Sequence, residues 1–303
     1  MIAGRGEEDH EEPHDGRQLV NQAIGAFTIG SFDCRVVSDG VAAYEPGDLY
    51  SDLGPDEAAP AVGPLVNDQG LMRLPYYPLL VRTPDGLALI DTGAGLALAE
   101  EWGEPVGRLD QALGAAGVTA DDIGLVLLSH AHPDHIGGLT TGNESGRRLV
   151  FPRARHVISR TEFEYWTSDR VPAGFASMGD LARLHLRPIE RAGMLDLVDG
   201  EQEVAPGIRV LPAPGHTPGH VAISISAGSQ HAIFVGDAVL GELNFGHPDW
   251  TSVLEVDRAQ AARTRSRLLD EAAREAALVA GYHLWGPGTV ERHEKAYRWN
   301  PLQ

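Results

Sequence analysis

The 303-residue sequence contains a single cysteine, Cys34. One cysteine excludes a disulfide framework, a four-cysteine zinc site and an iron–sulfur cluster. Basic residues are also scarce, because 24 Lys and Arg stand against 43 Asp and Glu, a formal net charge of -19. A chain this acidic repels phosphate backbones and anionic lipid, so we expect neither nucleic acid nor a membrane surface as a partner.

Long hydrophobic runs are missing as well. No apolar segment approaches the roughly 18 residues of a membrane span, and the first thirty residues carry no basic-then-apolar leader. We therefore expect a cytoplasmic protein. Hydrophobic residues still make up 43% of the chain, which allows a sizeable core in one large domain or in two fused halves.

Residues 1–22 are rich in acidic residues and hold almost nothing apolar. Such a segment cannot offset the entropy lost on ordering, so we predict a disordered acidic tail. Residues 23–303 are predicted to form a single domain of two β-rich halves, about 23–190 and 191–303. In each half strands come first and helices follow, which predicts an α+β fold with β-rich layers packed together and helices outside.

Local signals place several elements within this domain. Pro84-Asp85-Gly86 between two apolar runs predicts a hairpin turn. Ser159 followed by Glu162 predicts a capping box that opens a helix through Trp166. Asp257 is expected to cap the long helix that follows it.

Two segments rich in glycine and proline are candidates for moving parts. The stretch 45–72 is long for a connection inside a compact domain, and we interpret it as a flap over a site. The stretch 169–179 is stiffened by proline and freed by glycine, which suits a lid over bound substrate and suits a plain surface loop equally well.

The richest chemical signal is the run SHAHPDHIGG, directly after a buried apolar segment. Residues two apart face the same way in an extended chain, so His130 and His132 project together. Pro133 is pre-set for the first turn of a helix, which puts Asp134 and His135 at a helix start. Imidazole and carboxylate suit zinc, and equally iron, manganese or cobalt. Four such side chains within six residues are too crowded for one ion; the alternative is a polar loop with fortuitous histidines.

Three further ligand-type residues lie just beyond predicted strands. They are His216 in APGHTPGH, Asp237 in FVGDAV and His283 in LVAGYHLWGPG. Loops at strand ends are where a rigid scaffold presents functional groups. We therefore expect these side chains to join the first cluster.

The sequence resembles the metallo-β-lactamase fold superfamily of metallohydrolases from about residue 26 to the end. The resemblance is carried by DTG at 91–93, the cluster at 130–135, GHTPGH at 215–220, GD at 236–237 and the late His283, in the family's order. It implies a four-layer αββα sandwich with the site at the edge between its two β-sheets.

The resemblance also implies two divalent ions per chain, zinc first, with iron, manganese or cobalt as alternatives. It implies one ion held by His130, His132 and His216, and a second held by Asp134, His135 and His283, with Asp237 bridging both. A hydroxide between the ions would attack the substrate. Asp134 would accept the proton of that hydroxide and pass it to the leaving group.

Two neighbouring residues have supporting interpretations. Asp91 in the DTG turn resembles a residue that orients a ligand histidine, and a plain turn aspartate is an equal interpretation. His220 is expected to open a strand rather than to act as an eighth ligand. The remaining histidines outside the tail are assigned to the surface or to the core.

The leading functional hypothesis is hydrolysis of a small-molecule lactone, ester or phosphotriester. A β-lactamase with a zinc-binding cysteine is disfavoured, because Cys34 is the only thiol. Many quorum-quenching lactonases carry a tyrosine where this chain has Leu240, and the C-terminal stretch resembles more the branch of methyl parathion hydrolase and broad-spectrum lactonases. That branch implies a homodimer. A thioesterase of the glyoxalase II type, a mononuclear iron persulfide dioxygenase and a non-catalytic metal-binding protein are the alternatives.

Aromatic and apolar side chains near these motifs are candidates for a substrate pocket. We select Tyr76, Trp166, Phe175, Leu240 and Trp285, because they flank ligand-bearing segments or lie between the two halves. Core packing explains each of them at least as well.

Overall fold

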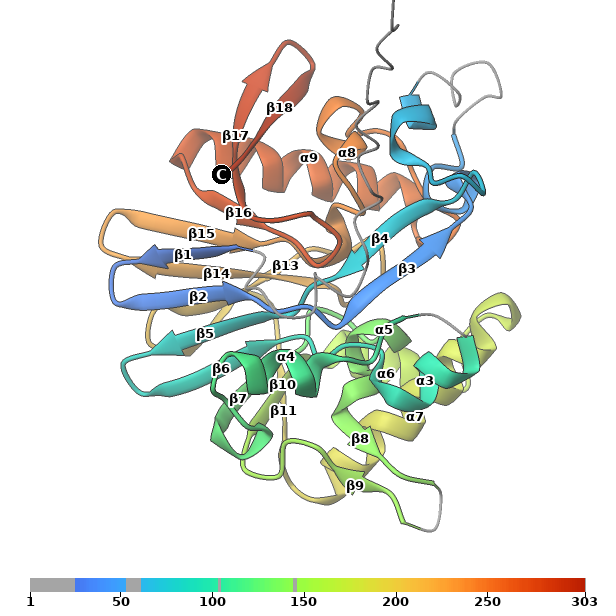
Figure 1. The fold of residues 1–303 in the computed structure, drawn as a ribbon, viewed down its shortest axis with the longest axis vertical. Coiled ribbons are helices and arrows are strands. Elements are labelled where there is room, and N and C mark those ends of the chain that lie inside the picture. Colours follow the sequence, from blue (N-terminus) through green and yellow to red (C-terminus); the bar gives the residue numbers. More distant parts are fainter. Residues whose placement is uncertain (1–24, 53–60, 103–104, 144–145, 303) are drawn as a thin grey trace, which may run out of the picture.

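The computed structural model describes residues 25–52, 61–102, 105–143 and 146–302 (Figure 1). The predicted tail at 1–22 and the middle of the predicted flap, 53–60, lie outside the described residues. Two seven-stranded sheets dominate the described part. Within it, no helix is both long enough and apolar enough to cross a bilayer.

The first sheet has the order β1-β2-β5-β6-β7-β10-β11. Its strands are β1 (Ala26–Ile29), β2 (Phe32–Val36), β5 (Leu79–Thr83), β6 (Gly86–Ile90), β7 (Ile123–Leu127), β10 (Arg155–Ser159) and β11 (Leu195–Val198). Strands β1 to β6 pair antiparallel, and the predicted hairpin turn is confirmed, since Thr83 pairs with Gly86. From β6 to β11 the pairing is parallel. Because β11 pairs with β10, the first sheet extends to residue 198, past the predicted division near 190.

The second sheet follows the chain from end to end in the order β12 to β18. Its strands are β12 (Gln202–Ala205), β13 (Ile208–Pro212), β14 (Val221–Ala227), β15 (Gln230–Phe234), β16 (Leu278–Ala280), β17 (Gly288–His293) and β18 (Ala296–Pro301). Only the β15–β16 pair is parallel. A parallel neighbour requires a crossover connection, and the long helix between these strands supplies it.

Apolar side chains on the facing sides of the two sheets form the central core. Val81, Ile90 and Leu127 of the first sheet join Ile223 and Phe234 of the second in one buried cluster. A second cluster packs the outer face of the first sheet against α4 (Leu109–Ala115), α6 (Arg160–Thr167) and α7 (Ala176–Arg191). A third packs α9 (Arg258–Glu275) on the outer face of the second sheet. The predicted four-layer αββα sandwich is therefore confirmed (Figure 1).

The two helix-capping predictions have different outcomes. The Asp257 side chain accepts a hydrogen bond from the Gln260 N–H at 2.9 Å, so the predicted cap of α9 is confirmed. Ser159 does precede α6, but its side chain makes no capping hydrogen bond. The predicted capping box is wrong because the Glu162 carboxylate turns into the protein instead of back to the helix start.

A small arm stands apart from the two sheets. Strands β3 (Gly40–Tyr44) and β4 (Met72–Tyr76) form an antiparallel hairpin that extends away from the sheets (Figure 1). Between them lie α1 (Pro46–Leu49) and η2 (Gly63–Leu65), and the hairpin shares a satellite core with Leu254. The flap prediction at 45–72 stays a prediction; its described parts belong to this arm.

The remaining elements are short. They are α3 (Gly95–Trp102), η3 (Ala120–Asp122), α5 (Pro133–Ile136), η4 (Gly137–Leu139), β8 (Thr140–Thr141), β9 (Arg148–Leu149), η5 (Ala173–Phe175), η6 (Gly236–Ala238) and α8 (Leu243–Gly246). The candidate lid at 169–179 comprises a loop, η5 and the first turn of α7, and its role as a lid stays a prediction.

Candidate metal centre

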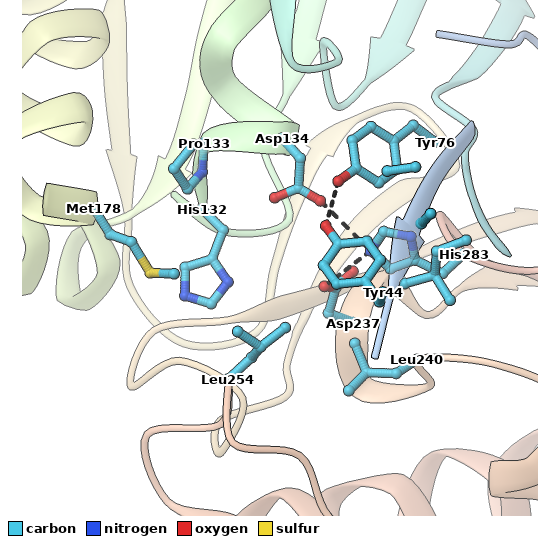
Figure 2. A pocket seen from close by; sticks show the side chains of 13 residues that line it. Tyr44, Tyr76, His132, Pro133, Asp134, Met178, Asp237, Leu240, Leu254 and His283 are labelled. Atoms are coloured by element: carbon cyan, nitrogen blue, oxygen red, sulfur yellow. Dashed lines mark hydrogen bonds and ion pairs between the residues drawn. The ribbon is translucent and has the colours of Figure 1, made fainter. Parts of the chain in front are cut away.

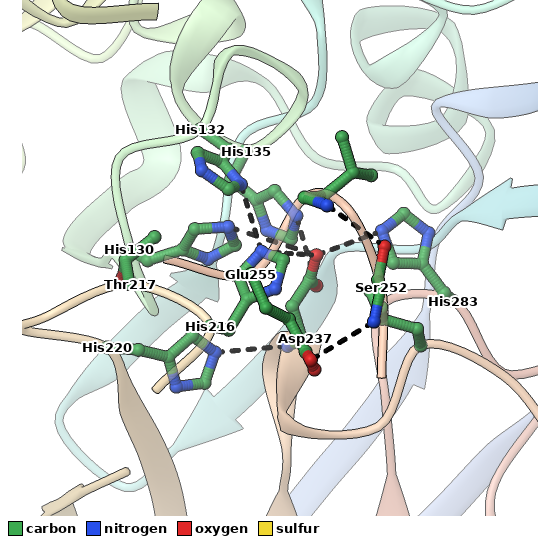
Figure 3. Close-up of polar contacts among 12 residues, drawn as sticks. His130, His132, His135, His216, Thr217, His220, Asp237, Ser252, Glu255 and His283 are labelled. Carbon is green, nitrogen blue, oxygen red and sulfur yellow. Dashed lines mark hydrogen bonds and ion pairs between the residues drawn. The ribbon is translucent and has the colours of Figure 1, made fainter. Parts of the chain in front are cut away.

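The predicted ligand residues come from four strand ends that meet at one edge of the sandwich. The loop after β7 carries His130 and His132, and α5 follows it directly with Asp134 and His135. The other three side chains, His216, Asp237 and His283, follow β13, β15 and β16. Figure 3 shows the imidazoles gathered around the carboxylate of Asp237.

These seven side chains fall into two groups whose potential ligand atoms lie within 4.8 Å of one another. The first group is His130, His132, His216 and Asp237, and the second group is Asp134, His135 and His283. This division matches the ligand sets that the family resemblance implies.

Asp237 joins the two groups. Its Oδ2 lies 3.3 Å from His216 Nε2 in the first group and 3.3 Å from His283 Nε2 in the second. Its Oδ1 lies 3.2 Å from His135 Nε2. One carboxylate that faces nitrogen atoms of both groups is suited to bridge two cations.

Several of these atoms are buried without a hydrogen-bond partner in the described part of the chain. They include His130 Nε2 and His132 Nε2. A buried polar atom that remains unpaired costs about 1–3 kcal/mol, and natural proteins rarely leave several together. Nitrogen and carboxylate oxygen are ligands for zinc and for other divalent transition metals. The residues present therefore fit a pair of such ions.

Asp91 orients two of the histidines. The carboxylate accepts from His135 Nδ1 at 2.8 Å and from the Ser129 hydroxyl at 2.7 Å, and the same hydroxyl lies 3.0 Å from His130 Nδ1. If Nδ1 carries the proton in both rings, each Nε2 lone pair is left to face the centre. Asp91 adopts φ 61°, in the left-handed region, which is unusual for a residue other than glycine.

The DTG turn and the glycines after His135 are packed backbone to backbone. A Cβ atom on Gly138 would lie 1.9 Å from the carbonyl oxygen of Thr92. No side chain fits in that space, so the turn carrying Asp91 can approach the histidine-bearing helix only because Gly138 has none.

Two further contacts fix other members of the centre. His283 Nδ1 lies 2.8 Å from the Pro75 carbonyl, which can only accept, so the nitrogen donates and Nε2 is left free to bind. His220 immediately precedes β14, as predicted, and its Nε2 accepts the Asp237 N–H at 3.0 Å. His220 therefore holds the backbone of Asp237 instead of adding an eighth ligand.

The electrostatics of the centre favour charged carboxylates and mostly neutral imidazoles. Burial alone would raise the pKa of Asp237, but the surrounding imidazoles, His135 first, hold it well below its usual range. Burial lowers the pKa of His130 well below normal and that of His132 to about 4. For His135 burial is outweighed by Asp237 and two other carboxylates, which raise its pKa well above normal. A divalent cation placed among these carboxylates would compete with that proton.

A cavity of about 350 Å³ opens onto the centre (Figure 2). Its floor is made by His132, Asp134, Asp237 and His283. Its walls are largely apolar and come from the arm, from α7, from the loop after β15 and from the loop between α8 and α9. The wall residues are Ala42, Ala43, Tyr44, Leu74, Tyr76, Met178, Leu240 and Leu254.

Two of the five predicted pocket residues, Tyr76 and Leu240, line this cavity, and the other three do not. Trp166 is fully buried beneath His132, with ring centroids 5.2 Å apart. Phe175 packs against Trp166, with ring centroids 6.1 Å apart. Trp285 is 41% exposed and packs against Tyr77. These three residues were selected for their proximity in sequence to the motifs, which does not determine which side chain faces the cavity. For example, Met178, about one turn after Phe175, faces the cavity in its place.

The wall residues that sequence reasoning missed include Tyr44, Leu74 and Leu254. Tyr44 and Leu74 lie on the β3–β4 hairpin, and Leu254 lies on the long loop between α8 and α9. For Tyr44 and Leu74, the available signal was the strand-like sequence at the two ends of the 45–72 stretch.

The αββα sandwich with this edge centre defines a metallohydrolase class, and the sequence agrees. Residues 73–283 match the Metallo-beta-lactamase superfamily, and the chain belongs to this family. It is 26% identical over 196 residues to an N-acyl homoserine lactonase of Bacillus thuringiensis, a match that covers 58% of this chain and 68% of the relative. It is 28% identical over 230 residues to a probable metallo-hydrolase of Mycobacterium tuberculosis, covering 65% and 67%.

Solved structures give the same result at the level of the whole fold. The structure of AidC, a dizinc quorum-quenching lactonase in complex with a product, superposes with a TM-score of 0.82 at 27% identity, covering 92% of this chain and 97% of AidC. The hydrolase AbOPH superposes with the same TM-score of 0.82 at 22% identity, covering 92% and 97%, and supports the fold alone. The chain is thus a metal-dependent hydrolase of the superfamily, similar to lactonases.

Proposed function

We propose that this protein hydrolyses an uncharged lactone at a centre of two divalent ions, with zinc as the preferred metal. The observation that carries the proposal is the pair of buried ligand groups joined by Asp237 beneath a largely apolar cavity. The similarity to lactonases, including a dizinc one, supports the lactone over other esters.

When bound, the two ions supply hydroxide near neutral pH and polarise the carbonyl oxygen of the substrate. Asp237 holds the two groups in register through contacts with both. Asp134, a member of the second group, lies 3.6 Å from His283 and lines the cavity, and its side chain is 13% exposed. In this proposal its carboxylate takes the proton and returns it to the leaving oxygen. The apolar walls exclude water from this transfer.

A pair of phenols adjoins the proton-transfer position. The hydroxyls of Tyr44 and Tyr76 hydrogen-bond to one another beside the Asp134 carboxylate (Figure 2). The charge of Asp134 contributes to raising the pKa of Tyr76, after burial, so this phenol stays protonated. It can therefore donate a hydrogen bond to the leaving oxygen. Leu240, at the position where many lactonases carry a tyrosine, has no hydroxyl that could do so.

The decisive experiment combines metal content with a substrate panel. Purified protein is expected to hold two ions per chain, to lose hydrolysis when stripped by a chelator, and to regain it with zinc. We expect the panel of lactones, aryl esters, phosphotriesters and thioesters to give the fastest turnover with lactones. Faster thioester turnover, oxygen-dependent persulfide oxidation by a single iron, or metal binding without turnover would each overturn the proposal.

Replacing Tyr76 with phenylalanine is expected to lower kcat about 10-fold, the typical value of one hydrogen bond, while the metal content stays unchanged. Steady-state kinetics and elemental analysis measure the two quantities. Tyr77→Phe is the matched control, because the Tyr77 hydroxyl is buried without a partner in the described structure, and this residue packs its ring against Trp285 and does not line the cavity. Equal losses in both variants would exclude a role for the phenol pair.

A further inference from the structure

The carboxylate of Glu162 is fully buried at the start of α6 and accepts four hydrogen bonds. Oε1 accepts the Ala131 N–H at 2.9 Å and the Trp166 indole N–H at 2.8 Å. Oε2 accepts the Thr217 hydroxyl at 2.8 Å and the Gly219 N–H at 2.9 Å. A buried carboxylate is costly unless its lone pairs are satisfied, and here they are.

The partners of Glu162 belong to the loops that present the first ligand group. Ala131 lies between His130 and His132, and Thr217 directly follows His216. The three histidines of the first group thus sit on two loops, far apart in sequence, that meet on one carboxylate.

The contact between α6 and the His216 loop is too close to tolerate a side chain. A Cβ atom on Gly219 would lie 2.1 Å from the backbone nitrogen of Glu162. The loop is therefore seated directly against the first turn of the helix, from which the Glu162 side chain extends.

The second group is oriented by other means. His135 is held by Asp91, and His283 is held by the Pro75 carbonyl. Glu162 hydrogen-bonds none of these residues. The supports of the two groups are largely separate, although Asp91 also reaches His130 through Ser129.

We propose that Glu162 is a positioning residue that sets the metal affinity of the first group, and leaves the second group nearly unaffected. The inference rests on the two-ion centre proposed above. Glutamine at this position keeps the shape but places an NH2 group against at least one of the four donors. The Gly219 N–H or the Ala131 N–H then loses its acceptor, and the geometry of the first group relaxes.

The test is metal retention by Glu162→Gln, measured by dialysis against graded chelator with elemental analysis, and by the absorption spectrum of the cobalt form. The parent protein is expected to retain two ions. The variant is expected to retain the ion of the second group with parental affinity. It is expected to bind the ion of the first group about 10- to 100-fold more weakly, the usual effect of losing a residue that orients metal ligands. Thr217→Val, which removes one donor, is expected to weaken the same ion by less.

Asp39→Asn is the matched control, because Asp39 is also fully buried and accepts the backbone N–H groups of Ala94, Gly107 and Leu109. It is expected to lower stability without weakening one ion selectively. The inference would be overturned if Glu162→Gln and Thr217→Val bound both ions with parental affinity, or if the affinity for both ions fell equally. Fewer than two ions in the parent protein would instead refute the two-ion centre.

Discussion

Asp237→Ala is expected to reduce hydrolysis by about 1000-fold or more and to leave fewer than two ions on the chain. Asp237 is the carboxylate that contacts imidazoles of both ligand groups, at 3.2–3.8 Å. Without it the remaining imidazoles of the first group offer no negative charge, and the pair of cations would face one another with less compensation. Loss of the paired ions removes the source of hydroxide at neutral pH.

The measurements are kcat/KM on the best lactone of the panel and ions per chain by elemental analysis. Asp237→Asn keeps the shape and the N–H contact to His220 but removes the charge, so we expect it to fall close to the alanine variant. Asp249→Asn, on the surface of the loop after α8, is the control and should keep both ions and full turnover. Parental metal content and turnover in both Asp237 variants would contradict the bridging role.

The clustering of the candidate ligand residues could be predicted from sequence because they lie in short motifs that follow strands. His130, His132, Asp134 and His135 lie within six residues, and a strand terminus followed by Pro133 fixes their directions locally. The order of strands and helices could also be predicted, because the spacing of apolar residues along the chain distinguishes strands from helices and indicates which faces are buried.

Other parts of the site depend on contacts between distant segments and left no local signal. Ser159 and Glu162 have the spacing of a capping box, but the buried N–H groups of Ala131 and Gly219 compete for the same carboxylate. The hydrogen bonds to these distant buried donors form instead of the local capping bond. The cavity wall likewise comes from a hairpin closed by pairing across residues 44–72, which no pattern within either strand specifies.

Arg265→Ala is expected to cause the largest loss of folding stability, about 3–5 kcal/mol, the usual cost of breaking a buried ion pair from one side. Arg265 is fully buried in α9 and contacts Glu255 Oε1 at 2.6 Å, with no exposed side-chain surface on either partner. It also donates to the carbonyls of Ala238, at 2.7 Å, and Trp250, at 2.6 Å. Alanine would leave a buried carboxylate and these carbonyls without their donor.

Urea unfolding of the metal-free protein measures this loss, and Arg263→Ala on the same helix is the control, expected to change stability by no more than about 0.5 kcal/mol.

Burial already raises the pKa of Glu255, and Arg265 opposes that rise. Without the arginine Glu255 would bind a proton more readily in the folded state, so the variant should recover part of its stability as pH falls. The double variant Arg265→Met with Glu255→Leu should lose less than Arg265→Ala. If Arg265→Ala cost no more than Arg263→Ala, the segments that carry Leu240 and Leu254 would owe their positions to packing and not to this ion pair.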